Sequence, residues 1–204
     1  MRRLWVVRIM DSAIDGFEQI SLADDRGQIA VVVELCQKHL TKHPRDGFSW
    51  LLYGMSQISL ARYAEAEKAI RKGIKFCPAK ARPIAYSKMG HLFKAKGDFN
   101  KAAFWYRKAI RNKPNHAGYH IFAGSNAYDR GWLRQAETHY RRALKCTEGS
   151  LDEAFFNLGG ILLGRRKYSE AIECYREALK IDPKYQIAKK RLDDAELAFL
   201  MANS

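Results

Sequence analysis

Residues 155–183 read FFNLGGILLGRRKYSEAIECYREALKIDP, and this stretch decides the fold because its spacing recurs along the chain. A glycine, two small residues and a proline stand here at Gly159, Ala171, Ala178 and Pro183. The same pattern occurs three times before it, and successive glycines are 36, 34 and 35 residues apart. The earlier sets are Gly54, Ala66, Gly73 and Pro78; Gly90, Ala102, Ala109 and Pro114; and Gly124, Ala136 and Ala143. A period near 34 residues is typical of stacked helical hairpins, in which each repeat buries its apolar face against its neighbours.

The residue types at these positions have a packing reason. Small residues spaced by helical turns let two helix axes approach closely, and aromatic residues four positions away fill the remaining space. Glycines at 97 and 131 predict the turns between helices, and the prolines end each hairpin because proline cannot continue a helix interior. The aromatic positions are Trp50, Tyr86, Phe155, Tyr106, Tyr140 and Tyr175.

The arrangement W-x2-Y-G followed by Ala, Gly and Pro in residues 50–78, and F-x2-L-G followed by Ala, Tyr, Ala and Pro in residues 155–183, resembles the tetratricopeptide repeat. The resemblance implies an all-α fold, a right-handed α-solenoid of helix-turn-helix hairpins. Two departures affect local angles: Glu148 replaces the third proline, and His120 takes an aromatic position. The four full repeats are 47–80, 83–116, 117–150 and 152–185.

The two ends extend the same pattern. Residues 12–46 are interpreted as a degenerate first repeat, with Gly27 at the turn between its helices. Residues 186–202 predict a capping helix, with an apolar stripe on one side and charges elsewhere, as terminal repeats need. Residues 1–204 are therefore expected to form a single domain. Three apolar residues lie off the stripe and form either a contact patch or ordinary surface: Leu197, Leu200 and Met201.

Positive charge is concentrated in the middle of the chain. The formal net charge is +14, and residues 68–128 contain fourteen Lys and Arg but one acid, Asp98. Part of this excess recurs at equivalent positions of the second helices, so we expect a basic ridge on the convex side. The ridge is either ordinary solvated surface or a binding surface. Its residues are Arg71, Lys72, Lys75, Arg107, Lys108, Arg111, Arg141, Arg142 and Lys145.

The resemblance also implies that a ligand binds the concave groove lined by the first helices. Counting from the aromatic positions, the groove is expected to be apolar at both ends and basic in the middle, which suits an acidic or amphipathic peptide or helix. The N-terminal repeat could instead cover Phe48, Leu51 and Leu52. The expected peptide-binding groove comprises Phe48, Leu51, Leu52, Met55, Lys88, His91, Lys94, Phe122, Tyr128, Phe156 and Asn157.

Signals for a catalytic, metal or cofactor site are weak. The histidine pairs at 39 and 43 and at 116 and 120 have no accompanying carboxylate motif, and His120 takes a packing position. The glycines at 159 and 164 are not followed by the Lys-Ser/Thr of a phosphate loop. We therefore expect no catalytic residues, no metal and no cofactor.

Cysteine usage and the absence of apolar segments bear on the compartment. Cys36, Cys77, Cys146 and Cys174 are dispersed and are expected to be free thiols. The apolar run near the N-terminus is interrupted by Arg8 and is too short for a signal peptide, and no stretch is long enough for a membrane span. A cytoplasmic protein is expected.

Two functions are compatible with these features. The first is a non-enzymatic scaffold that binds a partner protein in the groove. The alternative is non-specific binding of nucleic acid, such as RNA, through the basic ridge, since clustered Lys and Arg are its electrostatic signature. The residues after the aromatic positions form no consistent hydrogen-bonding code, so any such binding is expected to be independent of base sequence.

Overall fold

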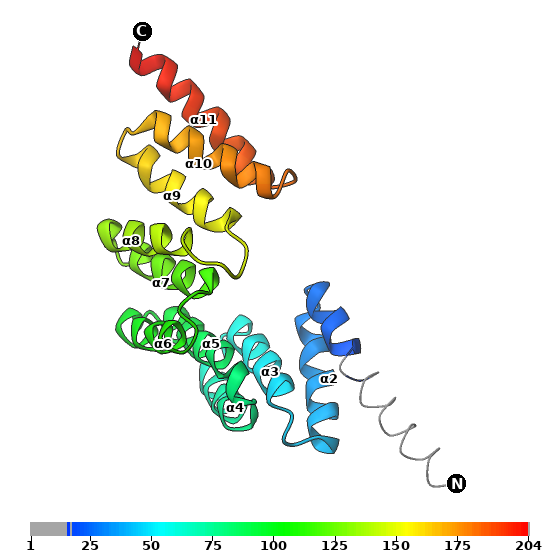
Figure 1. Ribbon diagram of the computed structural model, residues 1–204. Coiled ribbons are helices and arrows are strands. Elements are labelled where there is room, and N and C mark those ends of the chain that lie inside the picture. Colours follow the sequence, from blue (N-terminus) through cyan, green and yellow to red (C-terminus); the bar gives the residue numbers. More distant parts are fainter. Residues whose placement is uncertain (1–15, 17, 204) are drawn as a thin grey trace. The chain divides into compact units, whose positions relative to one another are not determined.

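The computed structural model describes residues 16 and 18–203, and over these residues it is helical and contains no strand (Figure 1). The all-α fold expected from the repeats is confirmed. Residues 18–25 are helical, and the short 3-10 helix Ala79–Ala81 precedes α5. The further helices are α2 (Ile29–Lys42), α3 (Gly47–Ser59), α4 (Tyr63–Phe76), α5 (Arg82–Ala95), α6 (Phe99–Asn112), α7 (Ala117–Asp129), α8 (Leu133–Ala143), α9 (Asp152–Gly164), α10 (Tyr168–Ile181) and α11 (Gln186–Asn203).

Contacts within the chain divide it into two compact units, residues 1–102 and residues 103–204. The helix pairs α3–α4, α7–α8 and α9–α10 form hairpins within one unit or the other. The N-terminal segment that bears on a signal peptide, and residues 12–15 and 17 of the degenerate repeat, lie outside the described residues. A single continuous array therefore stays a prediction.

In the first unit, α3 packs against α2, α4 and α5. The approach of α3 to α4 depends on Gly54, where a Cβ atom would lie 2.6 Å from Cγ1 of Ile70. Helical residues 18–25 and α2 form their own small core, against which Trp50 and Leu52 pack. The buried members of this core are Ile20, Ala23, Val32, Cys36 and Leu40. The N-terminal helices thus cover one side of α3.

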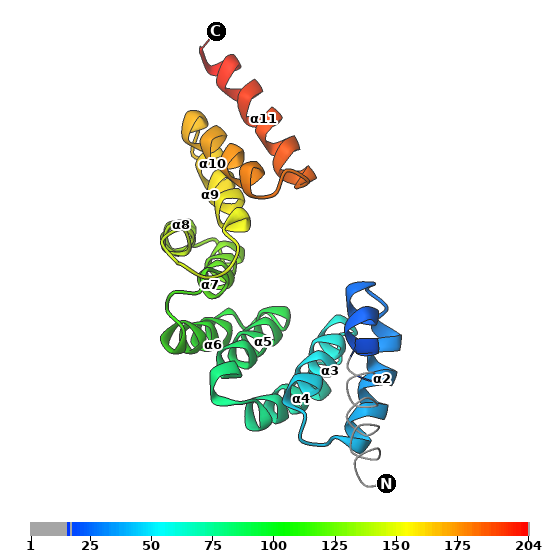
Figure 2. The same cartoon turned by 45° about the vertical axis from the view of Figure 1, so that its right-hand side comes forward.

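In the second unit, the hairpins α7–α8 and α9–α10 pack through α8 and α9, and α11 lies against α10 and α9 (Figure 2). The small and large residues of the sequence pattern meet as expected. A Cβ atom at Gly124 would lie 2.6 Å from the Tyr140 ring, and one at Gly159 would lie 2.8 Å from the Tyr175 ring. Both tyrosines are buried. Ala188 and Ala195 of α11 are fully buried, so α11 covers the last hairpin.

The missing proline of the third repeat is replaced by backbone pairing. The Glu148 amide donates to the carbonyl of Asn115 at 3.0 Å, and the Glu148 carbonyl accepts from the amide of Ala117 at 2.8 Å. Its carboxylate pairs with Lys113 Nζ at 2.5 Å. Glu148 is therefore tied to the start of α7 without a proline.

The four cysteines are free thiols, as expected. Burial raises the pKa of Cys36 to about 12 and that of Cys174 to about 11, so neither is activated as a nucleophile. Within residues 16 and 18–203, no helix has both the length and the apolar character that spanning a bilayer requires.

Candidate peptide-binding surface

A hollow of about 470 Å³ lies within the second unit. Three residues expected from the sequence to face a groove line it: Tyr128 at the end of α7, and Phe156 and Asn157 on α9. That these three residues bind a peptide stays a prediction. The full lining is Tyr128, Tyr140, Phe156, Asn157, Gly160, Leu163, Gly164, Tyr175 and Arg191.

Glycines on α9 keep the hollow open. A Cβ atom at Gly160 would meet only the Tyr175 hydroxyl, at 3.8 Å, and one at Gly164 would meet nothing within 4 Å. Glycine in a helix interior costs about 0.5–1 kcal/mol relative to alanine. Packing does not require a glycine at Gly160 or Gly164, because a Cβ atom would fit at both positions. The absence of side chains there leaves the space above α9 open.

Aromatic rings form the walls of the hollow. The Phe156 ring centroid lies 5.9 Å from that of Tyr175 and 5.0 Å from that of Tyr185. Tyr128 is 53% exposed, so part of its ring is available to a ligand. Burial raises the pKa of Tyr175 to about 12, and its hydroxyl therefore stays protonated and able to donate at neutral pH.

Besides the tyrosine hydroxyls, the polar groups of the hollow come from α9 and α11. The Asn157 amide can both donate to and accept from a peptide backbone. Arg191 supplies the positive charge of the lining, and its Nη1 atom lies 3.6 Å from Oδ2 of Asp194 on the same helix. The sequence prediction missed Arg191 because it ended the groove with the fourth repeat. Arg191 follows Phe156 by 35 residues, so one further period would have found it.

The residues expected at the N-terminal end of the groove are partly covered. Leu51 is 3% exposed, because its side chain fills the space above Gly73, where a Cβ atom would overlap it. Leu52 packs against the N-terminal core. Met55 is half-buried, whereas Phe48 is 40% exposed. Leu51 and Leu52 are thus packing residues in this structure, and Phe48 is the most exposed member of the set.

The basic centre lies on one face of α5. Lys88, His91 and Lys94 are half-buried and spaced one helical turn apart. Burial, followed by the charges of Lys88 and Lys94, lowers the pKa of His91 to about 4, so the imidazole is neutral at pH 7. Burial also lowers the pKa of Lys88, an effect that the Asp24 carboxylate opposes. The positive charge of this face therefore comes from the two lysines.

The remaining expected groove residue, Phe122, lies on α7 in the second unit. Its ring centroid is 6.1 Å from that of Tyr106, which is fully buried. The structure therefore gives Phe122 an aromatic packing partner from the preceding hairpin.

The expected ridge residues are exposed, apart from half-buried Lys108, but several of them are already engaged. The Lys72 ammonium lies 3.9 Å from the centre of the Trp50 ring. Arg71 pairs with Glu67 at 2.6 Å, and Arg141 pairs with Glu137 at 2.9 Å. The ridge consequently carries less unpaired charge than the sequence suggests.

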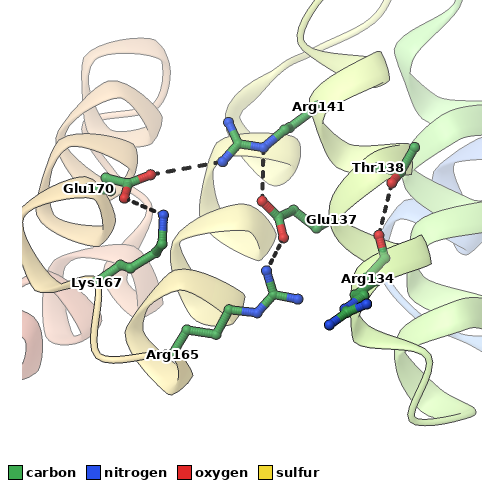
Figure 3. Close-up of polar contacts among 7 residues, drawn as sticks. All are labelled: Arg134, Glu137, Thr138, Arg141, Arg165, Lys167 and Glu170. Atoms are coloured by element: carbon green, nitrogen blue, oxygen red, sulfur yellow. Dashed lines mark hydrogen bonds and ion pairs between the residues drawn. The ribbon is translucent and has the colours of Figure 1, made fainter.

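Glu137 connects two hairpins of the second unit (Figure 3). Its carboxylate pairs with Arg141 on its own helix and with Arg165 at the end of α9. Arg141 also lies 3.9 Å from Glu170, which pairs with Lys167 at 2.7 Å. The network holds the α8 surface to the α9–α10 turn.

The described part of the chain contains no group of three or more His, Cys, Asp or Glu side chains arranged to hold a metal ion. His116 and His120 lie within the α7 hairpin, where His120 is buried as a packing residue. The surfaces described above present aromatic rings, an amide and cationic side chains.

Comparison with family models identifies tetratricopeptide repeats at residues 49–80, 84–116 and 152–185. The chain belongs to the tetratricopeptide repeat (TPR) family. TPR proteins act as protein-interaction scaffolds, and their fold is generally non-catalytic.

Solved TPR structures share the fold. A thermophilic TPR protein of Thermus thermophilus is 20% identical, with a TM-score of 0.69, covering 91% of this chain and 99% of that one. A TPR protein of Parabacteroides merdae is 16% identical, with a TM-score of 0.74, covering 88% and 69% of the two chains. A curated relative is anaphase-promoting complex subunit 3 of Schizosaccharomyces pombe, 26% identical over 156 residues. The alignment covers 76% of this TPR chain and 23% of the relative.

Proposed function

We propose that this TPR chain is a non-enzymatic scaffold that binds a peptide or helix of a partner protein on its first-helix surface. The observation that carries the proposal is the hollow lined by Tyr128, Phe156 and Asn157, because it joins apolar walls to a few polar groups. Such a combination suits a peptide that inserts one apolar side chain and hydrogen-bonds through its backbone.

The partner is proposed to be amphipathic, with acidic residues. In the second unit, Arg191 offers a cation beside the apolar walls. In the first unit, Lys88 and Lys94 give the face of α5 a positive charge. Each unit thus offers a surface that favours a carboxylate, and long-range attraction would speed association.

Assembly and location are part of the same proposal. The relative named above is a subunit of a complex, which supports a role for this chain in a multi-protein assembly. The four free thiols fit a reducing compartment such as the cytoplasm.

The test uses two positions on the surfaces of the second unit. Gly160→Leu places a side chain in the hollow without disturbing the core, whereas Gln186→Leu places the same side chain on an exposed position outside its lining. Proteins that the parent chain captures from a lysate would be identified, and the amount of each that the two variants capture would be compared with the parent. We expect capture of specific partners to be lost with Gly160→Leu and kept with Gln186→Leu. Equal capture by both variants would show that the hollow is not the binding site.

A further inference from the structure

One arginine recurs at the same position of the second helix in all four hairpins: Arg71, Arg107, Arg141 and Arg176. Three of the four are held by carboxylates. Arg71 pairs with Glu67, Arg141 with Glu137, and Arg176 with Glu196 at 2.6 Å. Among the described residues, Arg107 has no such partner.

Arg107 lacks a carboxylate partner on its own helix because one position of the repeat differs in α6. Glu67 and Glu137 occupy equivalent positions, and each also pairs with a cation at the end of the next first helix, namely Lys96 and Arg165. Ala103 stands at this position in α6, where it can accept no ion pair. The carboxylate that pairs with the recurring arginine in α4 and α8 is therefore missing from α6.

The cation equivalent to Lys96 and Arg165 is Arg130, which stacks on an aromatic ring. Its guanidinium carbon lies 3.5 Å from the centre of the Trp132 ring. Trp132 is 43% exposed. An exposed aromatic side chain and a stacked arginine thus stand where the first and third full repeats have an acid–base pair.

The outer face of α6 combines further aromatic and basic groups. Ala103, Arg107 and Arg111 follow one another at four-residue spacing, so they form one stripe of the helix. Both arginines are exposed. Phe104 borders the stripe and is 47% exposed, and Lys108 lies 5.1 Å over the Trp105 ring. Residues 99–128 contain no Asp or Glu, so no acid from these residues offsets the charge.

We propose that Phe104, Arg107, Lys108 and Arg111 on α6, together with Trp132 at the start of α8, bind single-stranded nucleic acid without sequence specificity. Exposed rings give bases a surface on which to stack, and cations beside them track the phosphates. An acidic peptide would use the cations but would leave the aromatic rings without a role. None of these residues lines the peptide-binding hollow, so an experiment can refute one of the two proposals and leave the other standing.

The test begins with direct binding at about 0.15 M salt. The probes are fluorescein-labelled oligouridine and oligothymidine of about 12 nucleotides, a polyglutamate peptide of similar charge, and a DNA duplex. We expect both single strands to bind, with the duplex and polyglutamate bound more weakly. No binding of either single strand, or equally tight binding of duplex or polyglutamate, would overturn the proposal. Preference between the two single strands would distinguish RNA from DNA as the source.

Two pairs of variants then locate the site. Ala103→Glu restores the missing carboxylate, and we expect it to weaken binding and to lower the slope of log affinity against log salt by about 0.7 for each phosphate that is no longer neutralised. Gln186→Glu adds the same charge at an exposed position of α11 and should leave binding nearly unchanged. Phe104→Ala with Trp132→Ala should weaken binding at least about 5-fold, whereas Phe199→Ala should not. Equal effects of each variant and its control would refute the assignment to α6, provided that circular dichroism shows all variants folded.

Discussion

His120 reaches the carbonyl oxygen of Pro114 through Nε2 at 3.1 Å, and Trp50 reaches that of Pro44 through Nε1 at 2.9 Å. In both cases the side chain lies six residues after the proline. His120 therefore takes the packing role of an aromatic residue with a ring nitrogen, as the sequence position indicated. The imidazole differs from indole in one respect, because it can bind a second proton.

This difference predicts sensitivity to acid. The His120 ring centroid lies 6.1 Å from that of His139, and the Nδ1 atoms of both are buried without a hydrogen-bond partner. Burial lowers the pKa of both histidines, with Arg142 adding to the effect, and that of His139 falls from 6.5 to about 4. Between pH 6.5 and pH 4 the unfolded chain therefore binds more protons at these histidines than the folded chain does. The free energy of unfolding keeps their full contribution above pH 6.5 and loses it as the pH falls toward 4. We expect the melting temperature to fall over this window.

A variant isolates the contribution of His139. His139→Phe keeps a ring of similar size and removes the titrating group. Its melting temperature should decline less between pH 6.5 and pH 4 than that of the parent chain. His91 titrates over the same range, so part of the decline should remain. Parallel curves for parent and variant would show that His139 does not contribute.

The neighbouring glycines of α9 should respond oppositely to alanine. A Cβ atom at Gly159 would lie 2.8 Å from the Tyr175 ring, whereas one at Gly160 meets only the Tyr175 hydroxyl at 3.8 Å. We expect Gly159→Ala to lower the free energy of unfolding by about 1–3 kcal/mol. Gly160→Ala should raise it by about 0.5–1 kcal/mol, because alanine restricts the unfolded chain. Urea denaturation of both variants measures the difference, and effects of the same sign would contradict this packing.

The repeat pattern predicted the fold because each of its positions has a single packing purpose. Gly124 against Tyr140 and Gly159 against Tyr175 are short-range consequences of a small residue facing a large one. Counting along the first helices assigns Tyr128, Phe156 and Asn157 to a groove, and these three residues line the hollow of the second unit.

Leu51 shows where such counting fails. Its position predicts a groove residue, but Gly73 stands on the facing helix where later repeats have alanine at 109, 143 and 178. The space left by the missing methyl group is filled by Leu51. Ion pairs between repeats cannot be predicted from the sequence either. The i,i+4 spacing of Glu137 and Arg141 indicates their pair, but the contact of Glu137 with Arg165 depends on how the hairpins pack.

Removal of residues 186–204 should destabilise the second unit. Ala188 and Ala195 of α11 are fully buried, and Ala195 belongs to the same core as Tyr175. Truncation exposes that core and also removes Arg191 from the hollow. We expect self-association or a fall in melting temperature of about 4 °C or more, as for solenoids without a terminal cap. Light scattering and thermal melting measure both, and a monomer that melts like the parent would show that α11 is dispensable.

The Glu137 network should contribute more to stability than a pair within one helix. Glu137→Ala leaves Arg141 and Arg165 without their shared carboxylate, whereas Glu177→Ala breaks only the contact with Lys180 on the same helix. We expect Glu137→Ala to cost about 0.5–1 kcal/mol and Glu177→Ala less, since exposed pairs within a helix typically contribute about 0.3–0.5 kcal/mol. The difference should shrink at about 1 M salt, where the Debye length falls to roughly 3 Å. Urea denaturation at low and high salt provides the measurement. Equal costs at low salt, or a difference that persists unchanged at high salt, would show that the bridge between α8 and α9 does not stabilise the unit electrostatically.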